Sequence, residues 1–180
     1  MLFRSARSVL TDPEVQPYLA ADDGAFEVPV TWTDADTGLT CKGKLDWLIP
    51  STKTIVDLKT CRDASTRRFC GDIGRYNYHA QLAHYAAGVH AAFGWRPEHL
   101  VLIAVEKTPP YDVGVFTIGA ELRDVGAEII RDLLRRVRDC RDAQSWPGAH
   151  PDPVYIERET KDVPGWLFGG DDDEIVFDEE

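Results

Sequence analysis

The sequence predicts an α/β fold in which helices flank a mixed central β-sheet of about five strands. Two patterns support this prediction. Short segments with period-two alternation or a continuous apolar run indicate strands within residues 26–60 and 100–117. Segments with helical periodicity follow each group of strands, over residues 76–93 and 120–141. At 180 residues, the chain is long enough to bury the core of one domain.

The N-terminal part predicts a broken helix followed by a half-buried strand. Residues 5–19 have the composition of a short helix interrupted near Asp12 and Pro13, and we expect it to cover an edge of the core. In the strand that follows, Glu27 begins the polar face. The opposite, apolar face is formed by Phe26, Val28, Val30 and Trp32.

The next two strands, residues 39–49 and 55–60, are predicted to form a β-hairpin with an acidic centre and to complete a three-strand meander. Alternation places Asp46 opposite an apolar face composed of Leu45, Trp47 and Ile49. In the second strand, one face carries Ile55, Asp57 and Lys59. If the strands pair, Asp46 and Asp57 converge, and burying two carboxylates with a lysine is costly unless a cation or substrate offsets their desolvation.

The middle of the chain is expected to be a loop and then a helix. Residues 61–75 are polar and basic, which indicates a solvated loop that could contact phosphate through Arg62, Arg67, Arg68 and Arg75. The helix over residues 76–93 places Gln81 and Tyr85 on one face and ends at Gly94.

The last elements complete the sheet and cover it. Residues 100–105 form a continuous apolar run, which is typical of a central strand, and residues 113–117 alternate as an edge strand. The amphipathic helix over residues 120–141 is expected to pack on the sheet. We expect a single domain over residues 1–168, with an irregular wrap after Trp146, and a disordered acidic tail over residues 169–180.

Composition narrows the classes of function. The net charge is −11, but residues 171–180 contribute seven negative charges and no positive ones, so the remainder carries only −4 and a basic groove within it is compatible with the total. No apolar run is long enough to cross a bilayer, and residues 1–10 lack the apolar core of a secretory signal. The four cysteines are scattered, which favours reduced thiols in a cytoplasmic protein.

The hairpin residues suit a metal-dependent hydrolytic site. Asp46 alone, or Asp57 with Lys59 as a surface ion pair, would be unremarkable. Together they place hard oxygen ligands on neighbouring apolar strands, which favours Mg²⁺ or Mn²⁺. Such a metal could activate water and polarise a phosphoryl oxygen, while Lys59 orients the water or neutralises developing charge.

The three motifs together resemble a known superfamily. The motifs Gly43-x-x-Asp46, Asp57-x-Lys59 and Gln81-x-x-x-Tyr85 are similar to those of PD-(D/E)xK nucleases of the RecB type. Within that superfamily, residues 32–47, 56–60 and 78–85 most resemble the phage and prophage exonuclease VIII, or RecE-like, group, as do the Trp-Pro-Gly at 146–148 and the Pro-Gly-Trp at 164–166.

The resemblance implies a DNA exonuclease that attacks the 5′ strand of duplex ends in phage or prophage recombination, within the bacterial cytoplasm. Asp46, Asp57 and the Leu58 carbonyl would hold Mg²⁺ or Mn²⁺, and Lys59 would be the catalytic lysine. Gln81 and Tyr85 would hold the DNA backbone or brace the site. A further metal or supporting carboxylate could come from Glu27, for which a solvated strand residue is an equal interpretation. A single-strand annealing protein and further copies of the chain are possible partners.

One departure from the family pattern leaves alternatives open. Relatives usually carry a histidine ligand on an upstream helix, and no histidine here precedes His79. Either the start of the chain is incomplete or metal binds without that ligand. The alternatives are a catalytically silent DNA-end-binding or assembly module and a repair or restriction-type endonuclease. His79 could touch phosphate; the remaining histidines, His84, His90, His99 and His150, are assigned no role in the site, and His79 and His84 fall on different helix faces.

Overall fold

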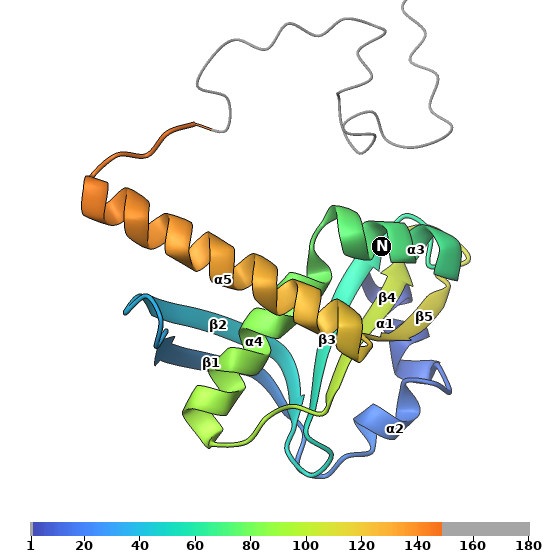
Figure 1. Ribbon diagram of the computed structural model, residues 1–180. Coiled ribbons are helices and arrows are strands. Elements are labelled where there is room, and N and C mark those ends of the chain that lie inside the picture. Colours follow the sequence, from blue (N-terminus) through green and yellow to red (C-terminus); the bar gives the residue numbers. More distant parts are fainter. Residues whose placement is uncertain (1, 149–180) are drawn as a thin grey trace, which may run out of the picture.

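Residues 2–148 are described by a computed structural model, in which helices cover both faces of a five-stranded sheet (Figure 1). The strands lie side by side in the order of the chain. The elements are α1 (Leu2–Thr11), α2 (Gln16–Leu19), β1 (Ala25–Thr33), β2 (Thr40–Ile49), β3 (Thr54–Cys61), α3 (Thr66–Arg75), α4 (Tyr78–Phe93), β4 (His99–Glu106), β5 (Val113–Thr117) and α5 (Ala120–Ala143). The strands β1, β2 and β3 pair antiparallel, β3 and β4 pair parallel, and β5 returns antiparallel to β4. The predicted fold class and the three-strand meander are therefore confirmed.

The strand β4 lies inside the sheet, between β3 and β5, and its side chains from Leu100 to Val105 are all buried. A continuous apolar run is the composition that such a doubly covered strand requires. Because β3 and β4 are parallel, the chain must cross over between them, and α3 and α4 form that crossover. Helix α4 ends as predicted, with Gly94 in the left-handed region at φ +79°.

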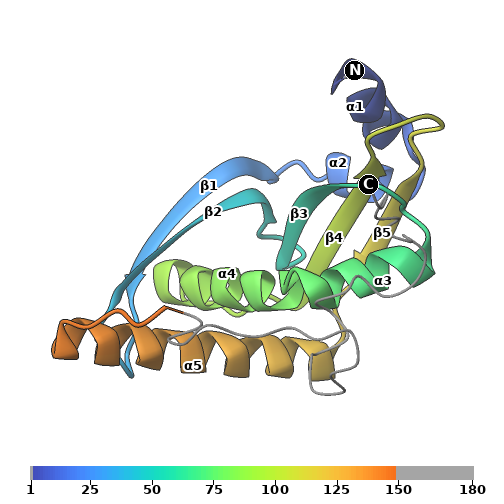
Figure 2. The same ribbon diagram turned by 90° about the horizontal axis from the view of Figure 1, so that it is seen from above.

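Two apolar clusters lie on opposite faces of the sheet. Figure 2 shows the helices that cover these faces, with α3 and α4 on one side of the strands and α1 and α2 on the other. The larger lies between the sheet and helices α3 and α4, and includes Val30, Leu45, Leu48, Ile55, Phe69, Leu82, Val89, Leu100 and Leu102. The second lies on the face next to α1 and α2 and consists of Val15, Trp47, Ile49, Val56, Val101 and Ile103. The predicted N-terminal helix is two helices, α1 and α2, and covers this second face.

Residues 66–75 form helix α3, so the predicted loop over residues 61–75 is wrong for this stretch. The helix buries only Phe69 and Ile73, which are four residues apart and therefore lie on one face. Its remaining positions include exposed Arg67 and Arg68. A polar segment with only two apolar residues predicts a loop. In the structure, however, those two residues are enough to hold a short helix against the core.

Helix α5 packs on α4 and not on the sheet, which corrects the predicted packing. Helix α4 already covers that face of the sheet, and α5 forms a further layer beyond it (Figure 2). Several apolar residues of α5 are consequently exposed, namely Leu122, Val125, Leu133 and Val137. Neither α5, which has 24 residues, nor any other helix within residues 2–148 is long and apolar enough to cross a membrane.

The side-chain alternation of β1 and β2 is interrupted at Glu27 and Asp46, which are not paired in the sheet. The pairing runs regularly on both sides of this point, from Phe26 with Trp47 to Val28 with Leu45, but Glu27 has a φ of +56°. Leu45 belongs to the cluster under α4, whereas Trp47 lies on the other face. The predicted common face of Leu45, Trp47 and Ile49 is therefore wrong, as is that of Phe26 with Val28, because one irregular step exchanges the faces.

The close approach of α5 to α4 predicts opposite effects of alanine at two helical glycines. A Cβ on Gly126 would lie 2.6 Å from the His79 carbonyl oxygen, whereas a Cβ on Gly71 in α3 meets nothing within 4 Å. Gly126→Ala should destabilise the fold by about 1 to 3 kcal/mol because backbone must move. Gly71→Ala should stabilise it by about 0.5 to 1 kcal/mol through helix propensity. Urea unfolding of both variants measures this, and equal shifts in midpoint would contradict the proposed helix contact.

Candidate active site

Asp57 is the buried acid of the site. It lies in the middle of β3 between β2 and β4, and its side chain is only 2% exposed. Its Oδ2 atom lies 2.5 Å from Lys59 Nζ and is buried without a well-formed hydrogen bond within residues 2–148. Burial raises the pKa of Asp57, and the negative charge of Asp46 adds to this, while the contact with the positively charged Lys59 opposes it. This carboxyl therefore lacks full compensation for its desolvation.

Asp46 lies next to Asp57 because β2 separates from β3 at this point. The paired residues of the two strands end with Trp47 and Val56. Beyond them, the Asp46 carboxylate accepts a hydrogen bond from the Leu58 N–H at 2.9 Å, in place of a strand partner. Since the N–H and C=O of a strand residue point to the same side, the Leu58 carbonyl also faces this edge. The structure thus brings together the three predicted oxygen ligands.

Lys59 is held by a chain of contacts that leads into α4. Its Nζ pairs with Asp57 and donates a hydrogen bond to Gln81 Oε1 at 2.8 Å. The Nε2 atom of Gln81 in turn donates to the Tyr85 hydroxyl at 2.9 Å. The side chain of Lys59 is only 16% exposed, so both its position and its direction are fixed. The predicted residues of β3 and α4 therefore form one connected network.

Two further residues contribute to this network: Tyr78, which was not predicted, and Gly43, which belongs to the first motif but was assigned no structural role. The ring of Tyr78 lies beneath Lys59, with Nζ 4.7 Å from the ring centroid. Gly43 leaves room for Tyr85, since a Cβ there would lie 2.9 Å from the tyrosine ring. The signal for Tyr78 was its position three residues before Gln81, on the same side of α4.

Glu27 is placed differently from the other acids. It forms an ion pair with Lys44, and its side chain is 61% exposed. Within residues 2–148, no group of three or more histidine, cysteine, aspartate or glutamate side chains is placed to hold a metal ion. Glu27 accordingly does not form a three-carboxylate group with Asp46 and Asp57 in this arrangement.

Two histidines of α4, His79 and His84, are packing residues. His79 is buried, and its Nδ1 lies 3.3 Å from the Ile73 carbonyl oxygen, so the predicted phosphate contact is wrong. His84 packs on Trp32, with ring centroids 4.6 Å apart. Burial lowers the pKa of His84, which keeps it neutral at pH 7. The two rings contact different parts of the fold, Ile73 and Trp32, and their five-residue spacing places them on different faces of the helix.

Comparison with known proteins identifies the family. The model of a family described as "PDDEXK-like domain of unknown function (DUF3799)" matches residues 6–155. This chain belongs to the PDDEXK-like DUF3799 family. The PD-(D/E)xK superfamily that the motifs predicted is therefore confirmed, and the RecE-like subgroup stays a prediction.

A comparison with solved structures found chains similar to the DUF3799 domain. One is the crystal structure of a protein named "Putative exonuclease" from Eubacterium rectale, with a TM-score of 0.58 and 18% identity, covering 89% of this chain. Another, the crystal structure of a protein named SSO0001, has a TM-score of 0.44 and 17% identity and covers 73% of this chain. The chain spans 66% and 55% of those two structures, respectively. A search of curated proteins found no match.

The residues of the DUF3799 site fit a hard divalent cation. The donor set consists of the carboxylates of Asp46 and Asp57 and the Leu58 carbonyl, all of which are oxygen ligands. The clearest sign is the Asp57 carboxyl, which is buried and incompletely compensated. A bound cation would supply the missing positive charge and favour the ionised carboxylate.

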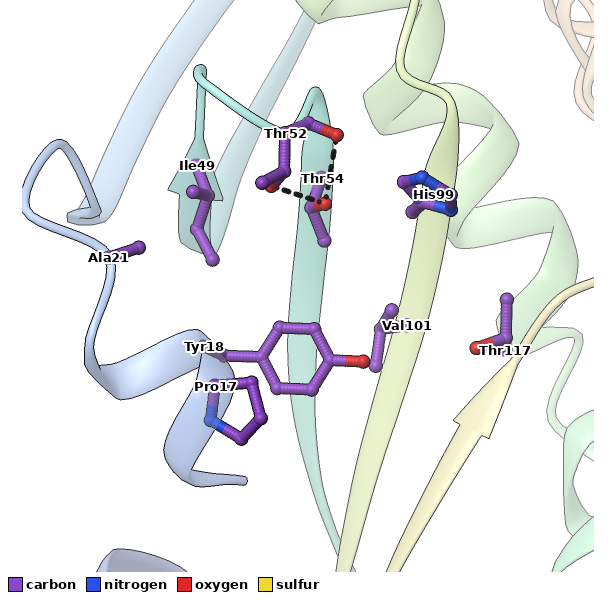
Figure 3. A pocket seen from close by; sticks show the side chains of 9 residues that line it. All are labelled: Pro17, Tyr18, Ala21, Ile49, Thr52, Thr54, His99, Val101 and Thr117. Carbon is purple, nitrogen blue, oxygen red and sulfur yellow. Dashed lines mark hydrogen bonds between the residues drawn. The ribbon is translucent and has the colours of Figure 1, made fainter. Parts of the chain in front are cut away.

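A cavity of about 300 Å³ lies elsewhere in the domain (Figure 3). It is located between α2 and the edge of the sheet where β3 and β4 begin, and its walls include Tyr18, Ile49, Thr54, His99 and Val101. The hydroxyls of Thr52 and Thr54 lie 2.8 Å apart at its side. None of the carboxylates or the lysine of the site lines this cavity, so it is separate from the chemistry of Asp57.

The raised pKa of Asp57 predicts that the ionised carboxylate lowers the free energy of unfolding of the protein. A carboxyl whose pKa is higher in the folded than in the unfolded protein destabilises the fold at pH values above its folded-state pKa, where it is ionised. At pH values below its unfolded-state pKa it is protonated in both the folded and the unfolded protein, and the effect is absent. In a metal chelator at pH 7, Asp57→Asn should therefore stabilise the protein by about 1 kcal/mol. The gain should disappear below about pH 3.9, the ordinary aspartate pKa. Thermal unfolding across pH measures this; a variant less stable than the parent at pH 7 would show that the ion pair outweighs desolvation.

Proposed function

We propose that this protein is a metal-dependent deoxyribonuclease that hydrolyses phosphodiester bonds. The observation that carries the proposal is the network of Asp57, Lys59 and Gln81, with Asp46 bonded to the same strand. Membership of a PDDEXK-like family supports it. Such a network places two carboxylates and an immobilised ammonium side by side at one edge of β3. A phosphate group bound there could contact the Lys59 ammonium and a metal ion held by the two carboxylates.

The proposed roles follow from the contacts. Asp46, Asp57 and the Leu58 carbonyl would hold Mg²⁺ or Mn²⁺, and the bound ion would supply Lewis acidity toward water and a phosphoryl oxygen. The ammonium of Lys59 would donate to a non-bridging phosphate oxygen and offset the charge that develops there. Gln81 positions Lys59 through its Oε1 atom. Its Nε2 atom is bonded to Tyr85, which fixes the orientation of the amide.

The substrate we propose is the end of duplex DNA, cut as an exonuclease. The likeness to the RecE-like group and the name "Putative exonuclease" of the Eubacterium rectale protein support this choice. We further propose 5′-strand processing in phage or prophage recombination in the bacterial cytoplasm. An annealing protein and other copies of the chain would be its partners. Arg67, Arg68 and Arg75, which are exposed on α3, are the local positive charge available to phosphates despite the acidic total.

A second candidate is a DNA-end-binding module without catalysis. The lack of a three-ligand group of His, Cys, Asp or Glu within residues 2–148 favours it, since Asp46 and Asp57 alone would bind a metal weakly. A repair or restriction-type endonuclease would use the same residues as the exonuclease and differ only in its substrate.

Nucleotide release from linear duplex DNA with Mg²⁺ tests the proposal. Lys59→Ala and Asp57→Ala should each lower the rate by about 10²- to 10³-fold, the usual effect of removing one preorganised charge contact. Lys53→Ala is the matched control, because Lys53 forms an exposed ion pair with Glu98 away from the site. Its rate should equal that of the parent.

The outcomes separate the candidates. Release by the parent that a chelator abolishes supports the nuclease. Equal release from the parent, Lys59→Ala and Asp57→Ala would refute the assigned site, and DNA binding without release would favour the silent module. Cutting of closed circular DNA would indicate an endonuclease instead.

A further inference from the structure

An exposed aromatic side chain lies at the junction of α3 and α4, beside the proposed site. Tyr76 follows the last residue of α3, and it is 55% exposed. Its ring stacks on that of Tyr78, with the ring centroids 5.6 Å apart and an angle of 28° between the planes. Tyr78 in turn contacts Lys59 Nζ. A chain of contacts therefore runs from the proposed catalytic lysine to an exposed aromatic ring.

The backbone of the junction positions this pair of rings. Asn77 adopts the left-handed conformation at φ +54°, which asparagine tolerates better than most residues, and the short turn sets Tyr76 beside Tyr78. The Tyr76 N–H donates to the Asp72 carbonyl at 2.9 Å, and the Asn77 N–H donates to the Gly74 carbonyl at 3.2 Å. These bonds involve only the backbone, so the turn itself does not require a tyrosine at position 76.

Positive charge accompanies the exposed ring. The guanidinium carbon of Arg75 lies 5.7 Å from the Tyr76 ring centroid. Arg67 and Arg68 are exposed on the same helix. An aromatic ring flanked by arginine is the combination that binds single-stranded nucleic acid, because the ring stacks on a base while the guanidinium contacts phosphate or the base face.

We propose that Tyr76, supported by Tyr78 and Arg75, is a stacking platform for an unpaired nucleobase of the strand whose phosphate meets Lys59. This inference rests on the proposed function and adds a substrate feature to it. A ring stacks on a base only when that base has left the duplex, so the platform selects a frayed or single-stranded end. Stacking does not depend on the identity of the base, so recognition is independent of sequence.

Fluorescence anisotropy with two labelled probes tests the platform, in EDTA so that neither probe is cut. One probe is an oligothymidylate, and the other is a strand of the same length in which abasic sites replace the nucleosides. The full chain should bind the thymidylate strand about tenfold more tightly, as expected for one stacked base. Tyr76→Ala should abolish this preference, and Tyr76→Phe should retain it because the ring remains.

A matched control is available at the other end of α4. Phe93 is 48% exposed and contacts Trp95, with the ring centroids 6.4 Å apart, so Phe93→Ala also removes one exposed ring from an aromatic pair. It should keep the tenfold preference. Thermal unfolding should show that Tyr76→Ala and Phe93→Ala are both folded at the temperature of the binding measurement.

The platform and the proposed function can fail separately. A parent with no preference between the probes, or a preference that survives in Tyr76→Ala, overturns the platform even if the protein cuts DNA. If the preference for the thymidylate strand is lost only in Tyr76→Ala, the platform is supported, whether or not the parent releases nucleotides. If the parent shows this preference but releases no nucleotides, the nuclease proposal fails, and the protein binds DNA ends without cutting them.

Discussion

The cost of burying the Asp57 carboxylate is the constraint on which the rest of the site depends. A charge in the middle of a sheet must be compensated locally, and Lys59, two residues along the same strand, provides part of that compensation. Lys59 is itself largely enclosed and needs a polar partner, which Gln81 supplies from the helix above. Gln81 is oriented by Tyr85, and Tyr85 fits only because residue 43 is a glycine. The burial of one acid therefore accounts for residues in three elements.

The interruption at Glu27 and Asp46 provides the second condition, an open strand edge beside the buried acid. If β2 continued to pair with β3, the backbone groups of Leu58 would be used in the sheet. Because the pairing ends at Trp47 and Val56, the carboxylate of Asp46 takes the Leu58 N–H instead. The same irregular step turns Trp47 to the opposite face from Leu45. The irregular region therefore coincides with the acidic edge and places Leu45 and Trp47 in different apolar clusters.

The sequence was informative wherever a strong local pattern had one structural solution. The acidic hairpin, the buried run from Leu100 to Val105 and the end of α4 at Gly94 are patterns of this kind. The contact of Lys59 with Gln81 was not predicted, since Gln81 was only expected to brace the site or hold the DNA backbone. The exchange of faces at Asp46 could not be predicted in this way. The assignment of side chains to alternate strand faces assumes regular backbone dihedral angles. No residue type in this segment predicts a φ of +56° at Glu27.

The other incorrect predictions have a different cause, because the features concerned are determined by tertiary contacts. Helix α3 is held by Phe69 and Ile73 against a core that a polar sequence does not reveal. The amphipathic pattern of α5 indicates that one face is covered but does not identify the covering element as α4. His79 lies where Gly126 brings α5 against the backbone of α4, and it is buried there and cannot reach phosphate.

In the proposed site Gln81 acts through Lys59, and a double-mutant cycle measures this most directly. Single-turnover cleavage of linear DNA would be compared for the parent, Gln81→Ala, Lys59→Ala and the double variant. If the two side chains form one unit, Gln81→Ala slows cleavage by about tenfold or more, and the double variant is no slower than Lys59→Ala alone. If the two effects multiply in the double variant, Gln81 acts independently of Lys59, and the account of the site is contradicted.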